Sequence, residues 1–205
     1  LKGKTLGVWF YGNEYPFLSW MSRLGLKTDG SANGVTVLRQ GWGVEPLTEG
    51  QAACVSTMSY NEYWVVRDAG YSPEQLTVFK YQSEGAATLE DGLYVHEKNL
   101  SDAAFKDKMV RFVRASMKGW KYAEANPKEA AMIILDNDDA GVQTENHQVR
   151  MMGEIAKLTA GSNGSLDPAD YERTVKVLMS GDSDPVITKK PSGAWTNEIT
   201  NAALN

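Results

Sequence analysis

The sequence has little of the side-chain chemistry that most enzymes and metal centres use. Its 205 residues include one cysteine, Cys54, and two histidines, His96 and His147, which lie far apart with no metal-ligand spacing around either. There is no nucleophile elbow, no phosphate-binding P-loop and no dinucleotide-binding glycine fingerprint. We therefore expect no catalytic residue, no bound metal and no cofactor.

Long hydrophobic runs and excess positive charge are also missing. No apolar stretch approaches the roughly 20 residues that a membrane-spanning helix needs. The net charge of -5 argues against nucleic acid as the main partner, because binding phosphates requires a basic surface. A single cysteine cannot form a disulfide within the chain, which is compatible with the cytoplasm and equally with a bacterial periplasm. The acidic run 136–141 departs from a calcium loop at its fifth and twelfth positions, so we interpret it as a solvated turn.

The first ~95 residues alternate short β-like runs with helix-like segments, which predicts parallel strands joined by crossover helices. The expected strands are 4–10, 35–38, 52–57, 76–81 and 92–96. The expected helices are 14–24, 45–50 and 59–69, with one more turn starting at Ser72-Pro73. The predicted fold class is therefore α/β, with one doubly wound, mostly parallel sheet followed by a helical C-terminal segment.

From about Ser101 the pattern becomes helical. Apolar side chains recur at helical spacing from Phe105 to Trp120, and further helices are expected from Asn126-Pro127, over 142–159, from Asp167-Pro168 and over 194–204. These helices have apolar stripes but no sheet of their own, so they either form a bundle or cover a sheet supplied by sequence absent here. The basic side chains Arg111, Arg114, Lys118 and Lys121 share one face, which is typical of a solvated side and alternatively of a docking surface for an acidic partner.

Two segments, 9–17 and 56–64, combine aromatic side chains with Asn and Glu at predicted strand-to-helix junctions. Ligands of open α/β sheets bind beyond the carboxyl ends of the strands, where such junctions lie. Aromatic faces can stack on a flat ring, carboxylates and amides can read its edges, and helix-start N–H groups can hold an anion. The expected ligand-binding residues are Tyr11, Gly12, Asn13, Glu14, Tyr15, Thr57, Tyr60 and Asn61. The expected core aromatics are Trp9, Phe10, Phe17 and Trp64.

Three motifs resemble a known family. The opening run 1–8 is similar to "L-K-G-K-x-[IV]-G", the start of the second lobe of type II periplasmic binding proteins. Residues 47–53 resemble their "L-x-x-G-x-x-D-A" step, with Ala53 in place of the usual Asp. Residues 104–135 are similar to the "F-x-x-A-x-x-x-G-W-x-x-A-x-x-N-P-x-E-A" helix pair of the NMT1/THI5-like (SsuA/THI5-like) branch. The most specific parts of the resemblance are the block from Gly119 to Ala131 and the Gly-Asn-Glu at 12–14.

The resemblance implies an extracytoplasmic solute-binding subunit of an ABC importer, a soluble protein or a lipoprotein, whose two lobes close on one small molecule and present it to a membrane permease. Ligands of the branch include thiamine-precursor pyrimidines, riboflavin and sulfonates, and Glu14 stands where an acidic residue would read an aminopyrimidine. Residues 1–95 would form the second lobe, and 96–205 would normally pack on the first. Because the chain opens directly on an apolar run, we expect the signal peptide and the N-terminal part of the first lobe to precede it. The uncovered apolar helix faces would then favour self-association.

Two other functions stay open. Eukaryotic members of the branch make the thiamine pyrimidine from their own histidine and a pyridoxal cofactor, and they carry a cysteine-rich motif, whereas Cys54 stands alone here. The strand ends also offer no lysine for a Schiff base. A sensory domain of the same fold, for example fused to a kinase, is the second alternative.

Overall fold

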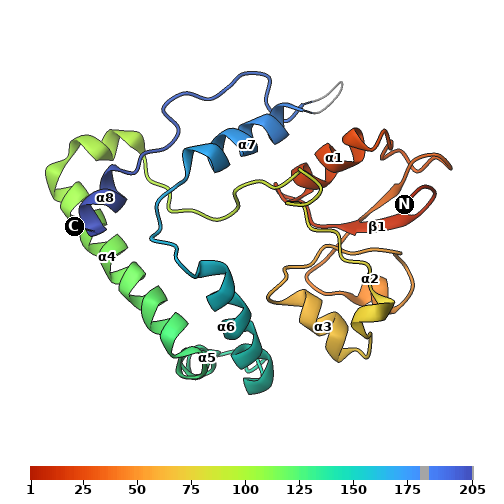
Figure 1. Ribbon diagram of the computed structural model, residues 1–205, viewed down its shortest axis with the longest axis horizontal. Coiled ribbons are helices and arrows are strands. Elements are labelled where there is room, and N and C mark those ends of the chain that lie inside the picture. Colours follow the sequence, from red (N-terminus) through yellow and green to blue (C-terminus); the bar gives the residue numbers. More distant parts are fainter. Residues whose placement is uncertain (181–184, 205) are drawn as a thin grey trace. The chain divides into compact units, whose positions relative to one another are not determined.

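The computed structural model describes residues 1–180 and 185–204, which form two compact units (Figure 1). Unit 1 comprises Leu1–Glu90 together with Pro168–Ser192, and unit 2 comprises Asp91–Asp167 together with the C-terminal segment from Gly193. Among the described residues, no helix is both long enough and apolar enough to cross a membrane.

Unit 1 is built on a small parallel sheet. Strand β1 (Thr5–Val8) pairs with β2 (Thr36–Arg39), with Thr5 opposite Thr36. On its other side β1 meets the segment around Cys54 through a parallel bridge at Leu6. The Gly7 N–H donates to the Cys54 carbonyl at 2.7 Å, which extends this contact. The predicted parallel arrangement of the first three apolar runs is therefore confirmed, with β1 in the middle.

The core of unit 1 forms where the first helix covers this sheet. Helix α1 (Glu14–Arg23) buries Phe17, Trp20 and Met21, which recur at the three- and four-residue spacing of one helical face. These side chains pack with Leu6 and Val8 of β1, with Val35 just before β2, and with other apolar residues. Fully burying one such side chain stabilises a fold by about 1.5–3 kcal/mol. The packing of α1 on the sheet thus holds the carboxyl ends of β1 and β2 in place.

Shorter helices complete the first part of unit 1. Helix α2 (Glu45–Thr48) has a proline in its first turn, and α3 (Glu62–Asp68) lies within the predicted helix 59–69. The single turn η1 (Pro73–Gln75) begins as predicted after Ser72, whose N–H donates to the Gln75 side chain at 2.8 Å. The predicted helices 14–24, 45–50 and 59–69 are confirmed, although each observed helix is shorter than the predicted range.

Two predicted strands, 76–81 and 92–96, are wrong. In the described residues neither segment joins a ladder, so the sheet has two strands and one bridge where five strands were expected. The first segment packs through aromatic rings, with the Phe79 and Tyr81 ring centroids 5.1 and 6.2 Å from that of Trp20. The second leaves Leu93 and Tyr94 exposed. A β-like run becomes a strand only where a neighbour pairs with it, and residue pattern alone does not supply one.

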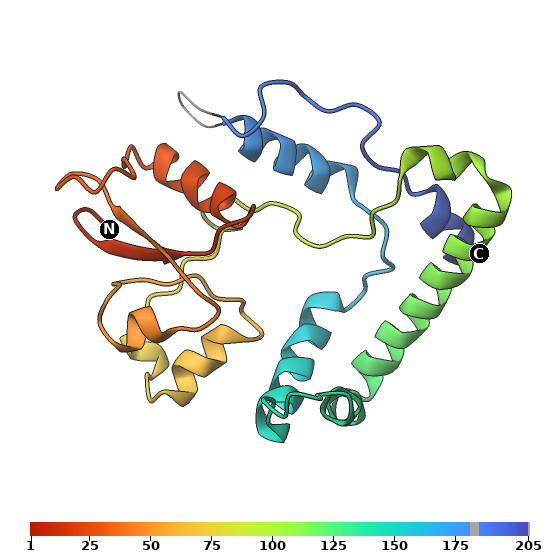
Figure 2. The ribbon, with the colours of Figure 1, turned by 180° about the vertical axis from the view of Figure 1, so that it is seen from behind.

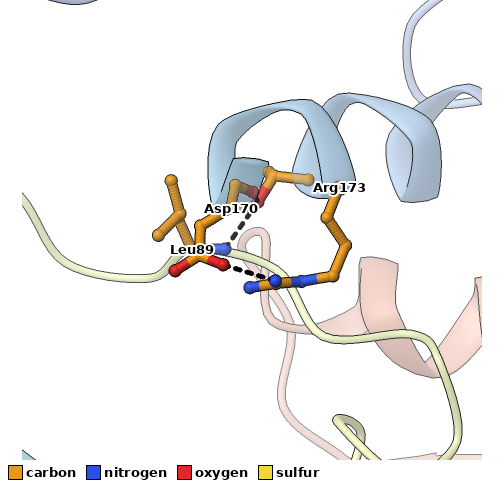
Figure 3. Close-up of polar contacts among 4 residues, drawn as sticks. Leu89, Asp170 and Arg173 are labelled. Carbon is orange, nitrogen blue, oxygen red and sulfur yellow. Dashed lines mark hydrogen bonds and ion pairs between the residues drawn. The ribbon is translucent and has the colours of Figure 1, made fainter. Parts of the chain in front are cut away.

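Helix α7 (Pro168–Met179) belongs to unit 1, although the sequence grouped it with the helical segment 96–205. It lies alongside α1 in both ribbon views (Figures 1 and 2), and the Ser19 and Ser180 hydroxyls are 2.8 Å apart. The Leu89 N–H donates to the Thr174 hydroxyl at 2.8 Å, next to an ion pair between Asp170 and Arg173 at 2.5 Å (Figure 3). These contacts hold the end of the first 90 residues against α7.

Unit 2 is helical, as predicted. Its longest helix begins after Asp102, whose carboxylate accepts hydrogen bonds from the Ala104 and Phe105 N–H groups and so caps the helix. Thr144 caps another helix in the same way, through the His147 N–H. In chain order the elements are η2 (Glu97–Ser101), α4 (Ala103–Ala125), α5 (Pro127–Asp136), α6 (Glu145–Thr159) and α8 (Glu198–Leu204).

Packing in unit 2 is sparse. Helices α5 and α6 share a small core of Ala130, Ala131 and Met152. Helix α8 lies beside α4 (Figures 1 and 2) because the Arg114 guanidinium donates to two carbonyls in the last turn of α8, at 2.9 and 3.0 Å. Arg114 therefore serves this helix end, so the predicted basic stripe is at least partly structural. No described residue of α4 is buried, and Trp120 is half exposed.

Candidate ligand-binding site

Three loops of unit 1 leave the carboxyl ends of neighbouring parallel segments. Residues 9–14 follow β1, residues 39–43 begin at the last residue of β2, and residues 56–62 follow the bridge at Cys54. Because the three segments run parallel, their carboxyl ends lie at one edge of the sheet. We call this set of loops the strand-end site.

The side chain of Gln40 ties two of these loops together. It is only 6% exposed, and its Oε1 accepts from the Ser56 N–H at 2.8 Å. Its Nε2 donates to the carbonyls of Ser56 and Gly43 at 2.9 and 3.0 Å. The Trp9 indole N–H adds a link from the first loop by donating to the Gly41 carbonyl at 2.9 Å. A buried amide whose donors and acceptor are satisfied specifies one arrangement, so the three loops are held as one surface.

The first loop holds an aromatic ring out into solvent. Tyr11 is 89% exposed and has φ of 67°, in the left-handed region that non-glycine residues seldom adopt. Gly12 follows at φ 109°, and its N–H donates to the Glu14 carboxylate at 2.7 Å. The Asn13 amide donates to the Phe10 carbonyl at 3.2 Å. Such backbone conformations cost about 1–3 kcal/mol and persist where the surrounding structure over-determines them, often at functional sites.

Arg39, at the end of β2, contacts this ring directly. Its Nη2 donates to the Tyr11 hydroxyl. Its guanidinium carbon lies 4.7 Å from the centroid of the Tyr11 ring and 5.6 Å from that of Phe10. A cation this close to two ring faces is attracted by their quadrupoles, worth about 0.5–1 kcal/mol at an exposed position. Arg39 therefore braces Tyr11 in its outward position.

The third loop is organised by its own acidic residue. The Glu62 carboxylate accepts from the Met58 N–H at 2.9 Å and from the Asn61 amide at 2.8 Å. The Asn61 N–H also donates to the Met58 carbonyl at 3.2 Å, which tightens the turn into α3. Like the Glu14 carboxylate in the first loop, the Glu62 carboxylate accepts its hydrogen bonds from groups of its own loop.

Most of the predicted binding residues lie at the strand-end site, and one, Tyr15, lies elsewhere. Tyr15 lines a different hollow, described below. Phe17 is buried as expected for a core aromatic, whereas Trp9, Phe10 and Trp64 are only half buried. The residues that lie in the first and third loops are Tyr11, Gly12, Asn13, Glu14, Thr57, Tyr60 and Asn61. Whether they contact a ligand stays a prediction.

The second loop was not predicted from the sequence. Arg39 and Gln40 have the contacts described above, and Trp42 is 95% exposed, more than any other large apolar side chain recorded in the described chain. The signal was present, because Arg-Gln-Gly-Trp-Gly follows directly on the predicted strand 35–38. The other two loops were predicted because Asn and Glu stand next to aromatic residues there, whereas residues 39–43 contain neither Asn nor Glu.

A separate groove of about 650 Å³ lies between α1 and α7 in unit 1. Its walls are mainly apolar, with Leu18, Met21 and Val177 among them, and Lys27 and Asp29 add charge. Hydrogen bonds from Ser31, first from its side chain and then from its backbone N–H, hold the pKa of Asp29 below its usual value. The groove shares only Tyr15 with the predicted binding residues.

Two titratable groups lie close to the strand-end site, and both are held neutral. Burial raises the pKa of the Cys54 thiol, so the reactive thiolate is disfavoured. Burial also raises the pKa of Tyr81 to about 12. Among the residues that the structure describes, no three His, Cys, Asp or Glu side chains come together in a way that could hold a metal ion. The polar groups of these loops include amides, the guanidinium of Arg39 and the carboxylates of Glu14 and Glu62, beside exposed aromatic rings.

Comparison with known proteins identifies the family of the chain. A search of curated proteins returned no match. The family model described as NMT1/THI5 like matches residues 1–130, which is more than half of the chain and includes all three loops of the strand-end site. That family covers solute-binding proteins and enzymes of thiamine pyrimidine synthesis, and it implies a periplasmic-binding-protein-like fold. The chain belongs to the NMT1/THI5-like family.

Proposed function

We propose that this protein is the solute-binding component of an ABC importer, acting outside the cytoplasm and handing its ligand to a membrane permease. The ligand is a small flat heterocycle or an anionic compound, with thiamine-precursor pyrimidines as the first candidates. Support comes from family membership and above all from one observation. Two exposed aromatic side chains, Tyr11 and Trp42, stand on loops that a buried glutamine network holds at the carboxyl edge of a parallel sheet.

The arrangement suits binding because the loops are fixed before a ligand arrives. Tyr11 keeps its outward position through its left-handed backbone and its contacts with Arg39. An aromatic face exposed to water gains by covering a flat ring, at about 0.5–1.5 kcal/mol beyond the area buried. A pre-organised surface also loses less conformational entropy on binding than a mobile one.

In this proposal residues 1–95 are the second lobe of a type II periplasmic binding protein. The helices of 96–205 pack on the first lobe, except α7, which packs on the second lobe in unit 1. The strand-end site is the second lobe's share of the cleft. Closure of two lobes around the ligand is the signal that the permease reads, because the closed state is favoured only when both lobes contact the same molecule.

Thermal unfolding with a ligand panel tests the proposal. A thiamine-precursor pyrimidine, riboflavin and an organic sulfonate are each added in excess to the purified chain. A ligand at 100 times its Kd stabilises the folded state by about 2.7 kcal/mol, which raises the Tm by several degrees. We expect a shift with at least one compound, and its loss in Tyr11→Ala and Trp42→Ala.

Tyr94→Ala provides the matched control, because Tyr94 is also a highly exposed aromatic but lies in unit 2, outside the three loops. It should keep the full shift. No shift with any compound would contradict the proposal. Pyridoxal absorbance or iron in the purified protein would instead indicate the enzyme branch of the family.

A further inference from the structure

The guanidinium of Arg39 is a cation without an acidic partner. In the described parts of the chain, residues 1–180 and 185–204, no carboxylate forms an ion pair with it, whereas arginines such as Arg111 and Arg173 have an aspartate partner. Its contacts are the Tyr11 hydroxyl and the faces of two aromatic rings. An arginine carries five N–H donors, and the Tyr11 hydroxyl takes only one. The Arg39 guanidinium therefore offers the strand-end site a positive charge and further N–H donors.

The carboxylates nearby are committed to their own loops. Glu14 accepts from the Gly12 N–H, and Glu62 accepts from the Met58 N–H and the Asn61 amide. Glu45 directs its carboxylate against the backbone of Gly43, where even a single added methyl group would collide with it. None of the three neutralises Arg39, although all follow the same sheet edge.

Arg39 is also held in place rather than free to sweep through solvent. The next residue, Gln40, is buried and anchored by three hydrogen bonds, which fixes the backbone at the end of β2. At the other end of the side chain, the Tyr11 hydroxyl and ring restrain the guanidinium. A planar guanidinium restrained in this way loses little further freedom when it binds the oxygens of an anion.

We propose that Arg39 makes the strand-end site selective for ligands that join a flat ring to an anionic group, such as a carboxylate, sulfonate or phosphate. The ring lies against the exposed aromatics, and Arg39 donates charge-assisted hydrogen bonds to the anionic oxygens. This inference rests on the proposed function and narrows it. The family resemblance favoured a pyrimidine-like ligand read by an acidic residue, Glu14, and gave an anionic ligand as the other option.

A pair of probes that differ in charge and hardly in shape tests the inference. Benzenesulfonate and benzenesulfonamide are titrated separately into the isotopically labelled chain, and backbone amide shifts are followed at 9–14, 39–43 and 56–62. We expect both to perturb these loops, and the sulfonate to bind about tenfold more tightly at low salt. Arg39→Gln should bring the two affinities together, while Arg39→Lys keeps part of the difference.

Arg23→Gln is the matched control. Arg23 is an exposed arginine of the same unit that donates to the Glu84 carbonyl, outside the three loops. It should leave the tenfold preference unchanged. Should Arg39→Gln prove poorly folded, Tyr11→Phe removes only the hydroxyl that positions the guanidinium, and it should reduce the preference without abolishing ring binding.

The outcomes separate the two proposals. Equal affinity of the wild-type chain for both probes, with the loops perturbed, would overturn the role of Arg39 and leave the proposed function standing. A preference that persists in Arg39→Gln would overturn it as well. If neither probe nor any compound of the thermal panel acts on the loops, the proposed function itself fails.

Discussion

The two units of this protein use the same kinds of side chain with different results. In unit 1 the apolar residues of β1, α1 and the segment just before β2 close into a core in which Met21 and Val35 are completely buried. In unit 2 the recurrent apolar positions of α4 to α6 give only a three-residue buried cluster. Large apolar side chains stay exposed there, among them Phe112, Trp120, Ile133 and Leu158.

The difference shows what a sheet contributes to a small domain. Parallel strands present a continuous apolar surface, so one amphipathic helix laid across it buries its whole stripe. Helices that meet only along their edges bury the small residues at the contact and leave the rest of each stripe in water. Unit 1 is thus the part expected to have a rigid core, and the strand-end site is attached to it.

The largest expected contrast is between two methionine-to-alanine substitutions. Met21→Ala in unit 1 should cost about 2–5 kcal/mol of unfolding free energy, because the packed core cannot collapse around the cavity. Met152→Ala in unit 2 should cost less, since the half-exposed helices around it can shift inward. Urea titration combined with amide hydrogen exchange at Val8 and Ala131 reports on each unit. Equal losses at the two sites would show that unit 2 is as tightly packed as unit 1.

A buried glutamine in each unit gives the next contrast. Gln40→Met in unit 1 should cost about 1–3 kcal/mol, since it leaves the Ser56 N–H and the Gly43 carbonyl without their partner. Gln148 in unit 2 donates to Gln143 at 2.5 Å, but its Oε1 has no partner among the described residues. Gln148→Met should therefore be nearly neutral.

Chemical denaturation measures both glutamine variants, and exchange of the Ser56 amide gives a local readout. We expect that amide to lose protection only in Gln40→Met. Unchanged protection there would mean that Gln40 does not hold the loops together, so that the strand-end site is not one fixed surface.

The smallest expected effect on stability concerns the exposed apolar face of unit 2. Phe112→Lys combined with Ile133→Lys should change the free energy of unfolding by only about 0.5 kcal/mol per site, because both side chains are already more than half exposed. We expect the wild-type chain to self-associate through this face, and the double variant to shift toward the monomer. Leu24→Lys with Val78→Lys, at exposed positions of unit 1, is the control. A monodisperse wild-type monomer in light scattering would disprove the expectation.

Local signals predicted the helices better than the strands because several helix starts are marked in the sequence. Pro127 and Pro168 stand at first helical positions as predicted, although the Asn126 side chain makes no cap hydrogen bond. Asp102 and Thr144, which were not predicted as caps, accept the cap hydrogen bonds of two other helices. Strands lack such local markers. The run 92–96 is as β-like as 5–8, yet only the latter has neighbours on both sides. Strand formation depends on pairing between distant segments, which a single sequence does not reveal.

The strand-end site was predictable only where its signals are local in the sequence. The junctions after β1 and after Cys54 could be located because an aromatic run with Asn and Glu follows each apolar run. The link that unites them could not, since Gln40 lies 16 residues from Ser56 and looks like any surface glutamine in the sequence. The contact of Arg39 with Tyr11 likewise joins residues 28 positions apart.

By itself the sequence determined that this is an α/β chain of the NMT1/THI5-like family, poor in catalytic and metal-binding side chains, with aromatic loops where strands end. Those features are local, written in periodicity, caps and motifs. Only the tertiary structure decided which apolar runs become strands and which unit α7 joins. It also decided that Glu14 and Glu62 accept hydrogen bonds from their own loops, while Arg39 has no ion pair with any described carboxylate. Those outcomes depend on which distant segments meet, because pairing, burial and charge neutralisation exist only between partners.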